Sequence, residues 1–429
     1  MAGGRDEAVP GRARLEASQH IYRVLVALVA FGLYWFSSFA LEARHGTMHF
    51  FGGDSFYYMQ LAQGNVFGRL ADEELIDRIF RFHPTTVVMA AGWMKLVEPL
   101  TPWIAPRHLL RALFAAVGAI GVWAAMWAFA AAVPRRHVAL WGAIYATSFG
   151  VWYFSSIEES KIVSATLAAL YIATYLHLRT RWTLHGAALL TALLLLACLN
   201  EIVAGFLIII PIVDALVQRG LDLRRGRWIA LHGLAGPIAL AILEGLTRSR
   251  TGAAGDHPEG ANHFSMLIWY VSQNNFSVAD LYEFLVNWLF FNIAAPTPDT
   301  PRALPMWQEY KGLFEPALAN YLASPVSVGL IVLFGVMLLA SVLPRHRSEG
   351  FGKSASILLA LLAYTLLRGV FFFVFLPSEG LLYASSVTLA HMLMIAMPFA
   401  ASSFPAKPLL LTAFALLLLV INGRFAIGV

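Results

Sequence analysis

Long apolar stretches, separated by short polar segments, alternate along the chain from residue 21 onward. A helix of about 20 apolar residues can cross the hydrocarbon core of a membrane and satisfies its own backbone hydrogen bonds there. The stretches close to this length are 21–41, 107–132, 136–154, 161–178, 184–199, 201–217, 228–247, 324–343, 354–376, 380–400 and 406–425. The pattern predicts an all-α integral membrane protein with about eleven transmembrane helices.

The polar segments between these stretches indicate the orientation of the chain. Basic residues occur in the N-terminal segment 1–20 and in the short loops 134–137, 179–181, 219–227 and 345–353. The positive-inside rule places such segments in the cytoplasm, so we expect a cytoplasmic N-terminal tail. A further stretch, 84–100, contains Lys95 and Glu98, and its apolar core is too short to cross. We interpret it as a re-entrant or interfacial segment on the outer side.

Two long loops, 42–106 and 248–323, then lie outside the membrane, and most of the 25 acidic residues fall on this side. Three segments within these loops place apolar residues at helical spacing, which predicts helices lying in the outer interface. These segments are 71–82, 264–271 and 279–293. The expected organisation is a tail at 1–20, a transmembrane module at 21–247 that includes loop 42–106, the outer loop 248–323, and C-terminal transmembrane helices at 324–429.

Composition excludes several other classes of protein. Hydrophobic residues make up 59% of the chain and charged residues 13%, whereas a soluble domain carries about 25% charged residues. The net charge of +5 does not indicate a nucleic-acid partner, because the basic residues are spread over short loops rather than gathered in one patch. The single cysteine, Cys198, excludes an intrachain disulfide framework and a multi-cysteine metal site.

The first outer loop carries a carboxylate in an unusual setting. Asp54 follows two glycines in the sequence GGDSFYYMQLAQG, and Tyr57 and Tyr58 follow it at i+3 and i+4. Asp54 could simply cap the helix that begins here. The two tyrosines would lie on the same side of that helix as the carboxylate, and we therefore favour a catalytic role for Asp54 as a general base.

Two further polar groups lie at the outer ends of apolar stretches. Glu158 and Glu159 form a short turn in VWYFSSIEESK, where adjacent carboxylates must be solvated, paired or used in function. The sequence leaves open which of the two is functional. His83, in FRFHPTT, could cap the helix that follows it or bind an anionic group.

The remaining candidates lie within the apolar stretches. Asn200 and Glu201 interrupt a long apolar run that begins at residue 184, which predicts a hairpin of two short helices with this pair at its apex. Arg368 lies inside a span, where an isolated cation costs about 2.5 to 3.5 kcal/mol on insertion scales. It therefore needs either an acidic partner, such as Glu201 or Glu379, or a ligand phosphate.

Taken together, these segments resemble the GT-C superfamily of polytopic glycosyltransferases, in particular the bacterial branch near the protein O-mannosyltransferases. The points of resemblance are GGDSFYYMQLAQG, FHPTT, WYFSSIEES and CLNE in this order, followed by a long outer loop. The resemblance covers roughly residues 20 to 330 and is carried by the order of weak motifs rather than by one specific motif. One departure is the Asn200-Glu201 apex, where relatives often have Lys or His.

The resemblance implies transfer of a sugar from a polyprenyl-phosphate donor to an acceptor hydroxyl at the extracytoplasmic face of a bacterial inner membrane. It implies Asp54 as the catalytic base, Glu159 or Glu158 as a second acidic residue, and phosphate contacts from His83 and Arg368. The full set of expected substrate-binding residues is Tyr57, Tyr58, His83, Arg368, Glu201 and Glu379.

Membrane lipids surround the protein, and the acceptor, whether protein, lipid or glycan, is left open. No metal or other cofactor is required by this chemistry, although acidic residues on the outer face could bind a divalent cation. The alternatives are a secondary transporter and a non-catalytic lipid-handling protein.

Overall fold

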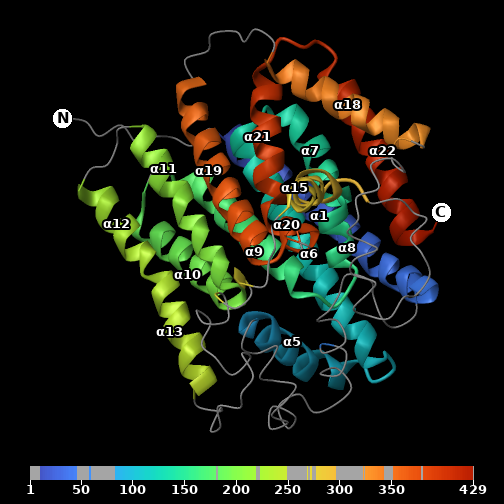
Figure 1. Cartoon of the computed structure of the whole chain (residues 1–429). Coiled ribbons are helices and arrows are strands. Elements are labelled where there is room, and N and C mark those ends of the chain that lie inside the picture. The colour runs from blue at the N-terminus through green and yellow to red at the C-terminus, as the bar shows by residue number, and fades with distance from the viewer. Residues whose placement is uncertain are drawn as a thin grey trace.

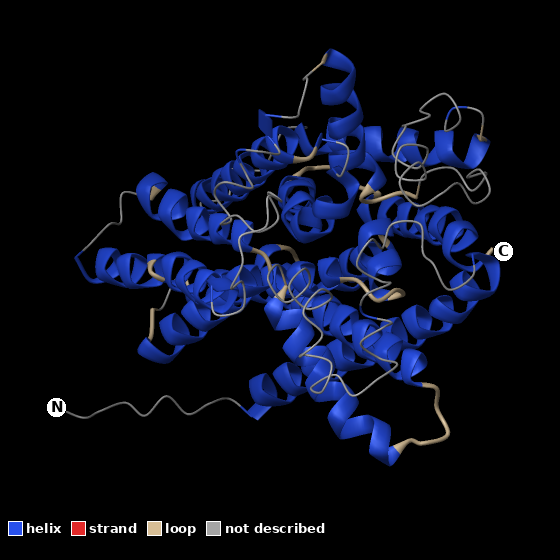
Figure 2. Ribbon diagram, turned by 60° about the horizontal axis from the view of Figure 1, so that its bottom comes forward, coloured by secondary structure: helices blue, strands red, loops and turns tan. Residues whose placement is uncertain are grey.

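The computed structural model describes residues 10–45, 58, 83–179, 182–218, 223–248, 268, 271–272, 277–295, 322, 324–342, 351–377 and 380–428. Helices are the regular elements throughout these ranges (Figures 1 and 2). Seven of them are long and apolar enough to cross a membrane, and three shorter apolar helices accompany them. The prediction of an all-α membrane protein is confirmed.

The first half of the bundle follows the predicted apolar stretches closely. Its helices are α1 (Pro10–His45), α6 (Pro106–Ala132), α7 (Arg135–Thr147), α8 (Phe149–Ser155), α9 (Ser160–Leu178), α10 (Leu184–Asn200), the 3₁₀ helix η2 (Ile202–Ile208), α11 (Ile209–Val217), α12 (Leu223–Gly233) and α13 (Ala235–Arg248). Three predicted spans in this half are not single α-helices. The stretch 136–154 is broken at Ser148, which is extended, and the stretch 201–217 begins as a 3₁₀ helix. The stretch 228–247 is divided at Leu234 between α12 and α13.

The C-terminal part supplies the remaining helices. They are α18 (Pro325–Val342), α19 (Phe351–Phe375), α20 (Gly380–Ala384), the 3₁₀ helix η6 (Ser385–Val387), α21 (Thr388–Ala401) and α22 (Lys407–Ile427). α21 packs against α18 and α19, and α11 packs extensively against α19, so the two halves of the chain share one bundle (Figure 1).

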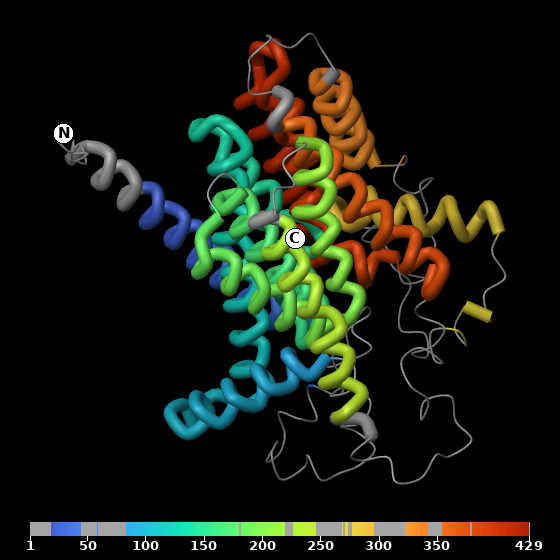
Figure 3. The backbone as a smooth tube through the Cα atoms, turned by 90° about the vertical axis from the view of Figure 1, so that its left-hand side faces the viewer, coloured from blue at the N-terminus to red at the C-terminus, as the bar shows by residue number. Residues whose placement is uncertain are grey.

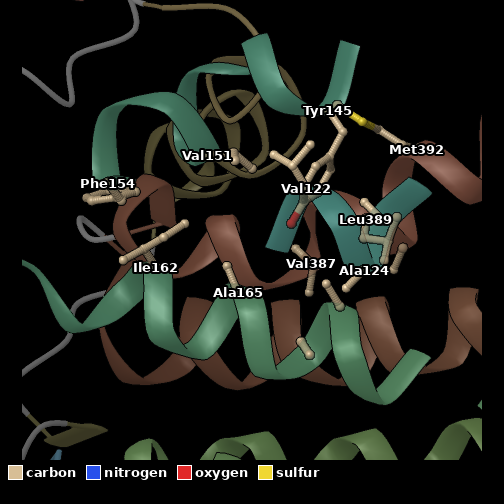
Figure 4. Packing of buried hydrophobic residues seen from close by; sticks show 14 of the residues in the cluster. Val122, Ala124, Tyr145, Val151, Phe154, Ile162, Ala165, Val387, Leu389 and Met392 are labelled. Atoms are coloured by element: carbon tan, nitrogen blue, oxygen red, sulfur yellow. The ribbon is translucent and has the colours of Figure 1, made fainter. Parts of the chain in front are cut away.

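α6 lies at the centre of this bundle and packs against α9 and α1. A small residue allows the close approach to α9: a Cβ atom at Gly121 would lie 2.8 Å from Thr166 Oγ1. Apolar side chains of α6 and α9, including Val122, Ala124 and Ala165, share a core with Leu389 of α21 (Figure 4). This packing fixes α6, and α6 carries the buried arginine described below.

α5 (Pro84–Val97) lies across one end of the bundle and is followed by the short 3₁₀ helix η1 (Glu98–Leu100) (Figures 1 and 3). Its 14 residues span about 21 Å, less than the roughly 30 Å of a hydrocarbon core. It contacts α6 and α10. The stretch 84–100 is not among the helices that are long and apolar enough to cross a membrane, and its interfacial or re-entrant position stays a prediction.

The helix predicted over 279–293 is present, but its surroundings differ from the expectation. α15 (Val278–Leu285) exposes several apolar side chains, whereas the π-helix that continues it, η4 (Val286–Phe291), buries Asn287 and Trp288. The next residue, Asn292, donates to Ala384 O at 3.0 Å and accepts from Thr388 Oγ1 at 2.9 Å. The second half of the segment thus lies inside the bundle, where the polar side chain of Asn292 finds hydrogen-bond partners. The predicted helix at 71–82, and all of the one at 264–271 except 268 and 271, fall outside the described residues.

The end of the bundle opposite α5 is held by a polar network around Asp214. Arg179 Nη2 lies 2.8 Å from Asp214 Oδ1, and the hydroxyls of Tyr175 and Ser356 each donate to this carboxylate at 2.6 Å. The network joins the ends of α9, α11 and α19, which lie next to the basic loops. The candidate functional residues described below lie at the other end.

Candidate functional site

A buried arginine organises the first of two charged groups at the α5 end of the bundle. Arg111 Nε lies 2.5 Å from Glu158 Oε1, and Arg111 Nη1 lies 2.5 Å from Glu42 Oε2. Arg107, one turn earlier on α6, also binds Glu42 at 2.7 Å. We call Glu42, Arg107, Arg111 and Glu158 the Arg111 cluster. It links the end of α1, the start of α6 and the turn before α9.

The Arg111–Glu158 pair has a structural role, because both of its charged side chains are buried. Both side chains are 0% exposed, and a buried charge is tolerated only when it is paired and hydrogen-bonded. This pairing accounts for the burial of Glu158. Glu159, the next residue, lies at the N-cap of α9 and is 1% exposed. Its carboxylate accepts a hydrogen bond from Ser160 Oγ at 3.0 Å.

Of the expected residues in the first outer loop, the structure describes Tyr58. Its side chain is 0% exposed and packs against Phe114 of α6, with the ring centroids 5.7 Å apart. Phe114 lies one turn beyond Arg111, so this part of the loop contacts α6 beside the Arg111 cluster. Asp54 and Tyr57 lie outside the described residues, as does Glu379.

Asn200 connects the start of α5 to the bundle. Its backbone oxygen lies 2.6 Å from His83 Nδ1, and its side-chain oxygen accepts hydrogen bonds from Thr86 N at 3.2 Å and Thr86 Oγ1 at 2.5 Å. Its amide nitrogen donates to Ser164 Oγ on α9 at 2.9 Å. Asn200 thus joins α5, α9 and α10, and His83 lies directly beside the hairpin apex.

The second charged group contains Lys161, Glu201 and Arg368, and we call it the cation site. Arg368 Nη2 lies 2.5 Å from Glu201 Oε1, with side-chain exposures of 1% and 7%. The position of Arg368 within an apolar span predicted that it binds either an acidic side chain or a phosphate. In the structure, Glu201 is its acidic partner. The positive charges of Arg368 and Lys161 favour the charged carboxylate form of Glu201.

Arg368 retains capacity to bind a ligand. Within the described part of the chain, its Nε and Nη1 have no hydrogen-bond partner. Lys161 is 3% exposed, and its Nζ lies 4.4 Å from the ring centroid of Tyr383. Tyr383 stacks on Phe372 with centroids 3.9 Å apart, and the Arg368 guanidinium lies over Phe372 at 5.0 Å. The three charged residues of the cation site carry two positive charges and one negative charge, which suits this group of side chains to a monoanionic ligand.

The described residues contain no group of three or more His, Cys, Asp and Glu side chains that could hold a metal ion. Binding of a divalent cation at the outer face therefore remains a prediction from the sequence.

Sequence reasoning did not identify Arg111 as part of the site. The signal was present, because Arg107 and Arg111 stand one turn apart at the start of an apolar span and a cation in this position requires an acidic partner. Lys161 was not identified either. Its approach to Glu201 depends on the packing of α9 against the hairpin apex, which spacing along the chain does not reveal.

No protein-family model matches the sequence, and no curated protein matches it. Two solved structures are similar to the chain over most of its length. The crystal structure of ArnT from Cupriavidus metallidurans bound to undecaprenyl phosphate has 17% sequence identity and a TM-score of 0.45, covering 89% of this chain and 78% of that one. The structure of the same protein in the apo state has 15% identity and a TM-score of 0.42, covering 90% and 78%.

Neither similarity assigns an activity to this chain.

Proposed function

We propose that this protein is a membrane glycosyltransferase that moves a sugar from a polyprenyl-phosphate donor to an acceptor hydroxyl at the extracytoplasmic face. The observation that carries the proposal is the cation site, where Arg368 and Lys161 are buried close to Glu201, and where Nε and Nη1 of Arg368 have no hydrogen-bond partner among the described residues. Such a site has the charge to bind a lipid phosphodiester at the end of a helical bundle.

The cation site would stabilise the leaving group of the reaction. When the bond between the anomeric carbon and the phosphate oxygen breaks, negative charge grows on the lipid phosphate. Fixed cations that already point at this position lower the barrier, because they need no reorganisation as the charge develops. Arg368 Nε and Nη1 and the Lys161 ammonium are the groups we assign to this role. His83 lies beside the same apex and is a further candidate for phosphate contact.

The acceptor hydroxyl needs a general base, and we assign this role to Asp54. Tyr58 follows Asp54 by four residues, so the covalent chain keeps their Cα atoms within about 14 Å of each other. The contact of Tyr58 with Phe114 supports a position for Asp54 at the end of the bundle where Glu159 and the cation site lie. Because Glu158 is paired with Arg111, we assign the second acidic role to Glu159.

The proposal requires loop 42–106 to face outward, and accessibility of introduced cysteines tests this. With Cys198 replaced, single cysteines at Gln63 and Gly255 are expected to react with a membrane-impermeant thiol reagent in intact cells. A cysteine at Gly226 is expected to react only after permeabilisation, because its loop is basic. Labelling of Gly226 but not Gln63 in intact cells would contradict the proposed orientation.

The function itself is tested by incubating the purified protein with a panel of polyprenyl-phosphate sugars and measuring sugar transfer or release. We expect turnover of at least one donor. Arg368→Gln and Lys161→Gln are each expected to lower kcat/KM about tenfold or more, because a charge-assisted contact to phosphate contributes roughly 1.5 to 3 kcal/mol.

Lys95→Gln is the matched control, because Lys95 is an exposed lysine on α5 and is expected to remain active. Binding of polyprenyl phosphate without turnover of any donor would favour a non-catalytic lipid-handling protein instead.

A further inference from the structure

The cation site contains a carboxylate that a simple phosphate-binding site would not need. Glu201 binds Arg368 at 2.5 Å and is almost fully buried beside it. Any anion bound by the remaining Arg368 donors must therefore lie within several ångströms of a second negative charge. Two unit charges at this separation repel each other appreciably when the effective dielectric constant is about 20.

Glu201 is held so that it cannot easily leave the site. Its backbone N–H donates to Ala197 O at 2.8 Å, and its backbone oxygen accepts a hydrogen bond from Ala204 N at 2.8 Å. The preceding residue, Asn200, is fixed to α5 and α9 by the hydrogen bonds described above. The backbone of Glu201 thus belongs to a rigid apex, and burial together with the pairing to Arg368 holds its carboxylate at the site.

We propose that Glu201 acts as a built-in competing anion at the cation site, which holds Arg368 in place when the site is empty and weakens the binding of the lipid phosphate. This inference rests on the proposed function, and it assigns Glu201 as a positioning residue that acts through Arg368. In the empty site the pair avoids an uncompensated buried cation. In the occupied site its repulsion speeds release of the polyprenyl phosphate left after sugar transfer.

Equilibrium binding of undecaprenyl phosphate to the purified full-length protein in detergent tests this inference, with undecaprenol as the uncharged probe. Glu201→Gln keeps the shape of the side chain and can still accept from Arg368, but it removes the charge. We expect this variant to bind undecaprenyl phosphate roughly tenfold or more tightly than the unsubstituted protein, as unit charges several ångströms apart imply. Its affinity for undecaprenol is expected to be unchanged. Glu201→Asp keeps the charge and is expected to bind the phosphate no more tightly.

A double variant keeps the test decisive if Glu201→Gln does not fold. Removing both members of a buried ion pair is tolerated far better than removing one. The double variant Arg368→Gln/Glu201→Gln is therefore compared directly with the unsubstituted protein. If Glu201 repels the phosphate, losing this repulsion offsets the lost Arg368 contact, and the double variant is expected to bind undecaprenyl phosphate within a few-fold of the unsubstituted protein.

Unchanged or weaker phosphate binding in folded Glu201→Gln, or a double variant that binds undecaprenyl phosphate tenfold or more weakly than the unsubstituted protein, would overturn the inference and leave the proposed function standing. If the unsubstituted protein binds undecaprenyl phosphate no better than undecaprenol, the proposed function fails, and this inference fails with it.

Discussion

Asp54→Asn is expected to lower sugar transfer by about 10² to 10⁴-fold, the usual effect of losing a general base, while the protein still folds and is expressed normally. The substitution removes the proton acceptor and preserves the shape of the side chain. Asparagine is also a good N-cap residue, whereas loss of a cap altogether lowers stability by only about 0.5 to 2 kcal/mol. Transfer from a donor that the unsubstituted protein uses, measured together with thermal unfolding in detergent, separates the catalytic role from the capping role.

Asp77→Asn is the matched control, because it makes the same chemical change in the same outer loop without touching the GGDSFYY segment. It is expected to stay within a few-fold of the unsubstituted activity. Activity of that order in Asp54→Asn would remove Asp54 from the catalytic role and leave it as a helix cap.

The helices could be predicted from the sequence because each apolar stretch must satisfy its backbone hydrogen bonds within itself. The breaks inside the stretches could not be predicted in the same way. Ser148 interrupts a span where Phe149 N and Gly150 N donate to backbone oxygens of residues 293 and 292, each at 2.9 Å. These partners lie far along the chain, so only the tertiary structure explains why the helix is interrupted at Ser148.

In the site as well, the sequence showed that a residue needs a partner but not which distant residue is the partner. The cost of burying a cation predicted that Arg368 needs an anion, but the sequence could not choose between Glu201 and Glu379. The contact between Arg368 and Glu201 joins residues that are 167 positions apart in the sequence. The sequence could not distinguish Glu158 from Glu159. The structure distinguishes them, because Arg111 pairs with Glu158.

Arg111→Met is expected to have the largest effect on stability of any substitution in the described residues. Removing one member of a buried ion pair leaves the other charge uncompensated, which typically costs about 3 to 5 kcal/mol. Here both Glu158 and Glu42 lose a partner at 2.5 Å. We expect strongly lowered expression and a large decrease in the thermal unfolding temperature in detergent.

Two further variants isolate the cause. Arg107→Met is the matched control: this arginine lies on the same helix and binds the same Glu42, but its side chain is 39% exposed. An exposed ion pair contributes about 0 to 1 kcal/mol, so only a small change is expected. The double variant Arg111→Met/Glu158→Gln removes the charge left behind at position 158 and is expected to recover much of the lost stability. Equal effects of Arg107→Met and Arg111→Met, or no recovery in the double variant, would show that Glu158 is not buried by its pairing with Arg111 and would return it to consideration as the second acidic residue of the transfer reaction.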